Sequence, residues 1–322
     1  PVVLRNSVIV LDDIERMHEK LGIDEVLGFI DEYSKQYGSR FVLVLNVDQL
    51  AEANKGLWKT FREKVIDHEL KLATTPNEAF AIAIGLMPSP YADALKRASI
   101  SCEVTNIRVV GKIIKAANHV LGHRLLDEAI VARVAPSIVL FSAIYYRGME
   151  DGPDFQFALN AGSPDWADFT RDKNKEPTEE EKRKDGWRLL MRELGIHGCD
   201  EFEAVLVEFL ESGLFDAVKI AAIVDRYIAE KQNLEARETA NQFLFKVVWD
   251  HRVDEAQLIV EAAKLPAIAG MLDPYVVSEL DQALAKLAGG ATIGQTIVDG
   301  WIAAFKAEKP EKVNDENPFN RP

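Results

Sequence analysis

The chain has 322 residues, of which 48% are hydrophobic, so it can bury the core of one large domain or of two ordinary ones. A formal net charge of −14 and an isoelectric point near 5.0 disfavour nucleic-acid and membrane partners, so any nucleic-acid contact would have to be local. The two cysteines, Cys102 and Cys199, lie far apart in the sequence. They disfavour a disulfide framework or a zinc ribbon and favour a cytoplasmic location.

The first 45 residues show the pattern of a strand, a helix and a second strand. Residues 2–11 are rich in Val, Leu and Ile and end in four consecutive apolar residues, as in a buried strand. Residues 22–37 carry an apolar stripe at helical spacing, and residues 41–45 form a second apolar run after Gly38. This order predicts a crossover unit with two parallel strands side by side.

Helical patterns dominate from residue 47 to residue 147. We expect helices over residues 76–86, 91–98, 104–121 and 126–146, with Thr75 and Glu78 forming a capping box and Gly122 ending the third helix. The apolar run from Val134 to Tyr146 is shorter than the ~20 residues that a membrane span needs, so we interpret it as a buried helix. No signal peptide is predicted at the start of the chain.

The remaining chain divides by composition into three parts. Residues 148–186 are rich in Gly, Pro and charge and predict a linker or exposed loop, although Thr178 and Glu181 can begin a short helix. Residues 187–308 show six helical patterns, typical of a bundle or small array in which Trp187, Trp249 and Trp301 anchor the core. Residues 309–322 read as a flexible tail, and we take residues 1–147 as the first domain.

Two adjacent carboxylates, Asp12 and Asp13, follow the first strand. A carboxylate at the end of a central parallel strand can hold Mg²⁺ through water, and we assign that position to Asp12. Asp13 then stands where a general base or water-orienting carboxylate is useful. The alternative is an Asp that caps a following helix, which is a common arrangement.

Two further residues are candidates for contact with phosphate. Asn46 ends the second strand, and its amide can hydrogen-bond an attacking water and a phosphate together; the alternative is an Asn that begins a turn. Arg108 opens a predicted helix and can reach a phosphate, or it can form a surface ion pair. Arg16, in the Glu15-Arg16 pair, is a weaker candidate, for charge relay or for a contact with a neighbouring subunit.

The order of the segments LDDIER, FVLVLN, FREKVIDHELKL and TNIRVVGKI resembles the KAP-like P-loop NTPases of the STAND and AAA+ grouping, over roughly residues 1–147. The resemblance implies catalytic roles for Asp13, Asn46 and Arg108 and a magnesium ion at Asp12. It also places Glu63 and Lys64 in a family segment that follows the second strand. It also implies an α/β fold joined to an all-α part: a portion of a P-loop NTPase parallel sheet with a helical lid, then a helical bundle or array.

The chain departs from that family in one motif. The sequence contains no G-x-x-x-x-G-K-[S/T] phosphate loop, which in the family lies upstream of the strand that ends in LDD. We therefore expect a fragment, or a degraded descendant, whose parent uses Mg²⁺ and ATP but which itself binds neither tightly. The missing segments should leave a sheet edge or an apolar face uncovered unless another chain covers it.

Two functions remain open from the sequence. The first is an ATP-dependent switch, for which the resemblance implies a setting in phage defence or signalling. The second is a non-catalytic helical module that binds a protein partner or self-associates. A zinc site at His119 and His123 is a minor alternative, since no third ligand is evident and both residues flank a predicted helix end.

Overall fold

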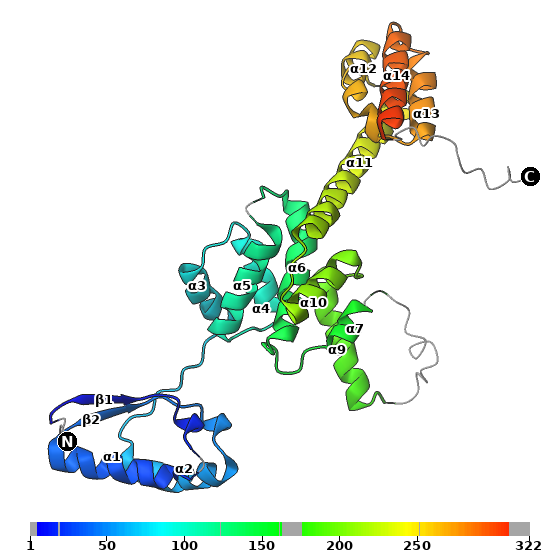
Figure 1. Ribbon diagram of the computed structural model, residues 1–322. Helices are drawn as coiled ribbons and strands as arrows, with labels where there is room; N and C mark the ends of the chain where they lie inside the picture. The colour runs from blue at the N-terminus through cyan, green and yellow to red at the C-terminus, as the bar shows by residue number, and fades with distance from the viewer. Residues whose placement is uncertain are drawn as a thin grey trace, which may run out of the picture. The chain divides into compact units, whose positions relative to one another are not determined.

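The computed structural model describes residues 5–18, 20–122, 124–160, 162, 176–250 and 252–308 (Figure 1). The chain forms two compact units, Pro1–Ala73 and Thr74–Pro322, and each is described by itself. The protein is mostly helical with one small parallel sheet, which confirms the mixed α/β and all-α class in outline. The expected first domain, residues 1–147, spans the division between the two units.

The first unit is built around a pair of parallel strands. Val8 pairs with Arg40 and Leu11 with Leu43, which confirms the predicted crossover. The connecting helix ends at Gly38, whose φ of 65° is a conformation that glycine adopts without strain. The elements of this unit are β1 (Val8–Leu11), η1 (Ile14–Arg16), α1 (Ile23–Tyr37), β2 (Arg40–Leu43), η2 (Val47–Gln49) and α2 (Glu52–Val65).

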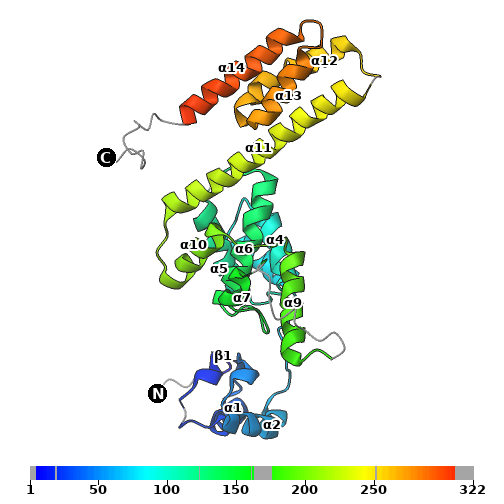
Figure 2. The same cartoon turned by 90° about the vertical axis from the view of Figure 1, so that its right-hand side faces the viewer.

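Only one face of the strand pair is covered. Helices α1 and α2 lie on the same side of the strands (Figures 1 and 2), where Ile23, Leu27, Ile30 and Trp58 form the centre of a small core. The other face carries Val8, Val10, Val42 and Val44, which are 66%, 60%, 47% and 49% exposed. The apolar face expected to lie uncovered is therefore present; we call these four residues the valine face.

The expected P-loop sheet with a helical lid is not what the structure contains. Within the described ranges the sheet has two strands, and no helix of the first unit covers the valine face. Residues 66–75, which follow α2, form neither helix nor strand. The sequence pattern identified the strand pair correctly, but the larger sheet was an inference from the resemblance alone.

The second unit is entirely helical in its described part. Its helices carry apolar stripes that meet in shared cores rather than on a sheet. They are α3 (Pro76–Leu86), α4 (Ala92–Ser101), α5 (Ile107–Leu121), α6 (Glu128–Tyr145), α7 (Phe155–Leu159), α9 (Glu179–Glu193), α10 (Glu201–Ser212), α11 (Ala217–Trp249), α12 (Glu255–Ala262), η3 (Leu265–Met271), α13 (Pro274–Leu284) and α14 (Gly290–Glu308).

Helix α11 contributes to two separate hydrophobic cores. Ile220, Val224 and Tyr227, in its first third, pack with α3 to α6 and α10, whereas Ala240 and Phe243, further along, pack with the helices that follow it. Two of the six helical patterns predicted within residues 187–308 fall in this stretch, and the structure has one helix of 33 residues (Figure 2). The prediction was wrong because no Gly or Pro interrupts the helix, only a change in which face is apolar.

Several local predictions are confirmed by hydrogen bonds. The capping boxes of Thr75 with Glu78 and of Thr178 with Glu181 both form, and Gly122 follows the last residue of α5. Trp301 donates from Nε1 to the Leu272 carbonyl at 2.8 Å and packs on the second core, but Trp249 is 69% exposed and anchors nothing there. The predicted tail and residues 163–175 of the predicted loop lie outside the described residues.

Among the described residues, α6 is the helix that by length and composition could cross a membrane. In the structure it is largely buried instead, with Val134, Ile138 and Phe141 fully covered by neighbouring helices. This agrees with the buried helix predicted for the apolar run.

Candidate functional site

The candidate site lies where the chain leaves the two parallel strands. Asp12 and Asp13 follow β1, and Asn46 follows β2 by three residues, so both sets of side chains come to one edge of the sheet. A hydrogen bond joins the two strand ends, because the backbone N–H of Asn46 donates to Glu15 Oε2 at 3.2 Å. The sequence did not single out Glu15, although it belongs to the same LDDIER segment.

The turn after β1 is strained. Asp13 has a φ of 55° and a ψ of 36°, in the left-handed region that costs a non-glycine residue about 1 kcal/mol. Its N–H donates to Asp12 Oδ1 at 2.9 Å, and its carboxylate accepts from Arg16 Nη1 at 3.4 Å. Asp13 precedes η1 but its side chain caps no N–H there, so the helix-cap alternative does not describe it. Both aspartates are exposed to solvent.

Asn46 has a structural role of its own. Its Oδ1 accepts from the N–H of Asp48 at 3.1 Å and so caps η2, which is the turn-forming role considered as an alternative. Within the described part of the chain, its Nδ2 has no hydrogen-bond partner. The oxygen of this amide is thus committed to the turn, and the nitrogen remains able to donate to a ligand.

The carboxylates at this edge fit magnesium only in combination with a substrate. No group of three or more His, Cys, Asp or Glu residues among the described residues is arranged to hold a metal ion alone. Mg²⁺, however, usually takes one or two protein carboxylates and completes its shell with water and phosphate oxygens. Asp12 and Asp13, exposed and adjacent, match that requirement.

The remaining candidates lie elsewhere. Glu63 and Lys64 are exposed in the last turn of α2, where Lys64 Nζ lies 5.8 Å from the centre of the Phe61 ring. Arg108 belongs to the second unit, near the start of α5, and its N–H donates to the capping Asn106 Oδ1 at 3.0 Å. The unit that holds Asp12 and Asn46 therefore does not include Arg108.

A buried polar cluster in the second unit escaped the sequence analysis. Glu203, on α10, accepts from Ser137 Oγ and Arg133 Nη1, both at 2.6 Å, while Tyr227 Oη donates to Asp200 at 2.5 Å. Burial and the hydrogen bond to Asp200 raise the pKa of Tyr227. The cluster joins α6, α10 and α11, and its hydrogen bonds are satisfied within the protein, so its arrangement is that of a structural network.

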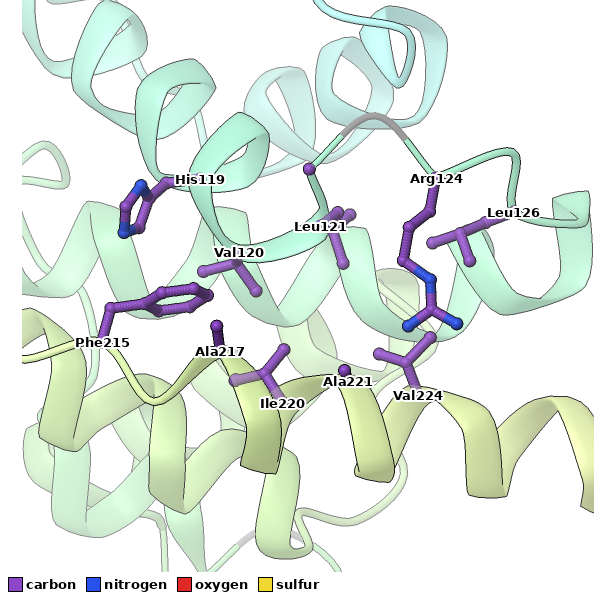
Figure 3. A pocket seen from close by; sticks show the side chains of 11 residues that line it. His119, Val120, Leu121, Arg124, Leu126, Phe215, Ala217, Ile220, Ala221 and Val224 are labelled. Carbon is purple, nitrogen blue, oxygen red and sulfur yellow. The ribbon is translucent and has the colours of Figure 1, made fainter.

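A shallow apolar groove of about 190 Å³ lies between the end of α5 and the start of α11 (Figure 3). His119, Val120 and Leu121 line one wall, and Ile220, Ala221 and Val224 line the other. The His119 ring lies 4.3 Å from the Phe215 ring, and Arg124, at the end of the groove, pairs with Asp225. His123 lies outside the described residues, so the two-histidine alternative stays a prediction.

In comparisons with known proteins, no protein-family profile, no curated protein and no solved structure matches this chain.

Proposed function

We propose that residues 5–66 form the magnesium-and-water side of a nucleoside-triphosphate hydrolysis site of the KAP-like P-loop kind, and that the protein works as an ATP-dependent switch. One observation carries the proposal: the hydrogen bond from Asn46 to Glu15 holds both strand ends together, with Asp12 and Asp13 on one and the Asn46 amide on the other.

Each residue at this edge has a role that its chemistry allows. Asp12 holds the ion through water, Asp13 accepts a proton from the attacking water or orients it, and Asn46 Nδ2 donates to that water or to a phosphate oxygen. Magnesium, when bound, supplies positive charge against the phosphate oxygens. Arg16 holds the Asp13 carboxylate in place through their ion pair.

The valine face supports the same proposal. Parallel sheets are normally covered on both faces, and two strands alone are marginal. A strand and helix that carry a phosphate loop would cover Val10 and Val42 and place a phosphate beside Asp12. Since the 322 residues contain no such loop, we expect this chain alone to show no ATP binding by calorimetry at micromolar nucleotide.

A second candidate function is a non-catalytic interaction module. Its support is the far end of α11, where Phe245, Val248 and Trp249 lie exposed at helical spacing on one face. An exposed apolar face of this kind fits a protein partner or self-association. This function requires neither Asp12 nor a nucleotide.

The test is Mg²⁺-dependent ATP hydrolysis by the complete product of the gene. We expect hydrolysis that Asp12→Asn abolishes, because the amide loses the charge that holds the ion. The matched control is Asp31→Asn, a half-exposed aspartate on α1 whose ion-pair partner in the described part of the chain is Lys35, at 2.7 Å, and it should hydrolyse normally. A complete product without a phosphate loop, or unchanged turnover in Asp12→Asn, overturns the proposal.

A further inference from the structure

The exposed face of α5 carries only positive charge. Arg108, Lys112 and Lys115 follow one another at spacings of four and three residues, so they share an arc of about 60° on the helix. All three are exposed, and α5 contains no Asp or Glu. Because like charges at this spacing destabilise a helix, the stripe is not explained by folding.

These cations have no acidic partners among the described residues. Across the described ranges, none of the three forms an ion pair, whereas other cations of the second unit, such as Arg133, Lys219 and Lys231, do. In a chain of net charge −14, a helix that carries three exposed cations and no carboxylate is a local concentration of positive charge.

Aromatic rings and a further cation lie beside the stripe. Lys112 Nζ is 4.4 Å from the centre of the Tyr146 ring, and that ring is 4.9 Å from the ring of Tyr145, which is 40% exposed. Arg147 follows and is also exposed. The next residue, Gly148, lies so close to α5 that a Cβ there would meet Val109 Cγ1 at 2.6 Å, which holds this turn against the start of the helix.

We propose that this surface, formed by Arg108, Lys112, Lys115, Tyr145 and Arg147, binds single-stranded nucleic acid. The cations follow the phosphate backbone along about 10 Å of helix, and the ring of Tyr145, which is 40% exposed, stacks on an unpaired base. An acidic protein segment would form ion pairs with the cations but would not need to stack on the Tyr145 ring. Repulsion from acidic groups elsewhere on the chain is screened beyond about 8 Å at physiological salt.

The test is fluorescence anisotropy of the intact chain with a labelled oligodeoxythymidine of about 15 nucleotides. We expect binding that weakens with salt, with a log–log slope of about −0.7 for each phosphate contacted. The double variant Lys112→Glu, Lys115→Glu should lose affinity about tenfold or more and show a shallower slope. Tyr145→Leu should lose about fivefold with the slope unchanged, because it removes stacking but no charge.

The matched control is Lys264→Glu, Lys286→Glu, which changes net charge equally at two exposed positions, one between α12 and η3 and the other between α13 and α14. It should bind within about twofold of the parent, because these sites flank the helices of a hydrophobic core separate from the one in which α5 packs. Circular dichroism verifies that each variant is folded. Absence of binding by the parent at low salt, or equal losses in both double variants, overturns the proposal. Binding of poly-L-glutamate in place of the oligonucleotide would also overturn it and indicate an acidic protein partner.

Discussion

The guanidinium of Arg133 and the carboxylate of Glu203 form a bidentate pair, with Nη1 2.6 Å from Oε1 and Nη2 3.2 Å from Oε2. The Glu203 side chain is fully buried, whereas that of Arg133 is 31% exposed. The pair connects α6 to the first turn of α10, where Glu203 also accepts from the N–H of Asp200 and completes a capping box. One carboxylate therefore fixes both a helix start and a helix contact.

Replacing Glu203 with Gln should lower the free energy of unfolding of the second unit by about 2–4 kcal/mol. The variant leaves the partly buried Arg133 with only its 3.2 Å pair to the more exposed Asp200, and removing the buried charge of such a pair is costly. The matched control is Glu201→Gln on the same helix, whose exposed pairs with Lys219 and Arg226 should be worth less than about 1 kcal/mol. Chemical denaturation measures both, and equal effects would refute the structural role of the buried pair.

The Asp200 carboxylate should make the stability of the same region depend on pH. Burial alone would raise its pKa, but hydrogen bonds from Tyr227 Oη and the Phe202 N–H, with the charge of Arg133, hold the pKa below its ordinary value. A lowered folded-state pKa contributes stability above the unfolded value near 3.9, and this contribution is lost as the pH falls through the folded pKa.

The stability advantage of the parent over Asp200→Asn should therefore shrink as the pH falls below about 4. Tyr227→Phe should move the acid limb of the parent's stability curve to higher pH, because it deletes the donor to Asp200. Urea denaturation at a series of pH values measures both effects. An advantage over Asp200→Asn that stays constant down to the lowest pH would contradict the assigned pKa direction.

Neighbouring residues of β2 should respond to truncation very differently. Phe41 points to the covered face and packs edge-on against Phe29 and Tyr33, with ring centres 6.1 and 6.2 Å away. Phe41→Ala should cost about 2–4 kcal/mol in the first unit, and Val42→Ala, on the valine face, less than about 0.5 kcal/mol. Hydrogen exchange of α1 measures the difference. A large cost for Val42→Ala would mean that the valine face is covered in solution.

The sequence predicted the strand pair because its signals are local. Residues 8–11 and 41–43 are apolar, the helix between them ends at a glycine, and a connection that contains a helix is typical of parallel pairing. The extent of the sheet could not be predicted, because it depends on segments that pair over long distances. The resemblance supplied those segments as an expectation, and the described chain does not contain them.

The candidate site was predictable in type but not in detail. Two aspartates after an apolar strand indicate carboxylates at one edge of the sheet. No local sequence pattern shows that Asn46 Oδ1 accepts from the Asp48 N–H, or that Glu15 accepts from the Asn46 N–H and joins the strand ends. The cluster of Arg133 and Glu203 joins residues 70 positions apart. Its only sequence signal is the D-x-x-E capping box that begins at Asp200.

Two substitutions of Asn46 should separate its structural role from its functional one. Asn46→Ala removes the cap of η2 and should lower the free energy of unfolding of the first unit by about 1 kcal/mol. Asn46→Asp keeps an oxygen for the Asp48 N–H and should preserve most of that stability, because Asp caps as well as Asn. It also adds a negative charge beside Glu15, which raises repulsion at the strand ends.

If the sheet edge that carries Asp12, Asp13 and Asn46 hydrolyses ATP, the Asn46→Asp variant of the complete gene product should lose that activity although its stability is retained. A carboxylate repels phosphate and donates no hydrogen bond. Thermal unfolding and steady-state hydrolysis, measured on both variants, give the comparison. Activity that follows stability, with Asn46→Asp active and Asn46→Ala impaired, would show that Asn46 acts only through its turn. Loss of activity in a stable Asn46→Asp variant would assign the Nδ2 donor to the reaction.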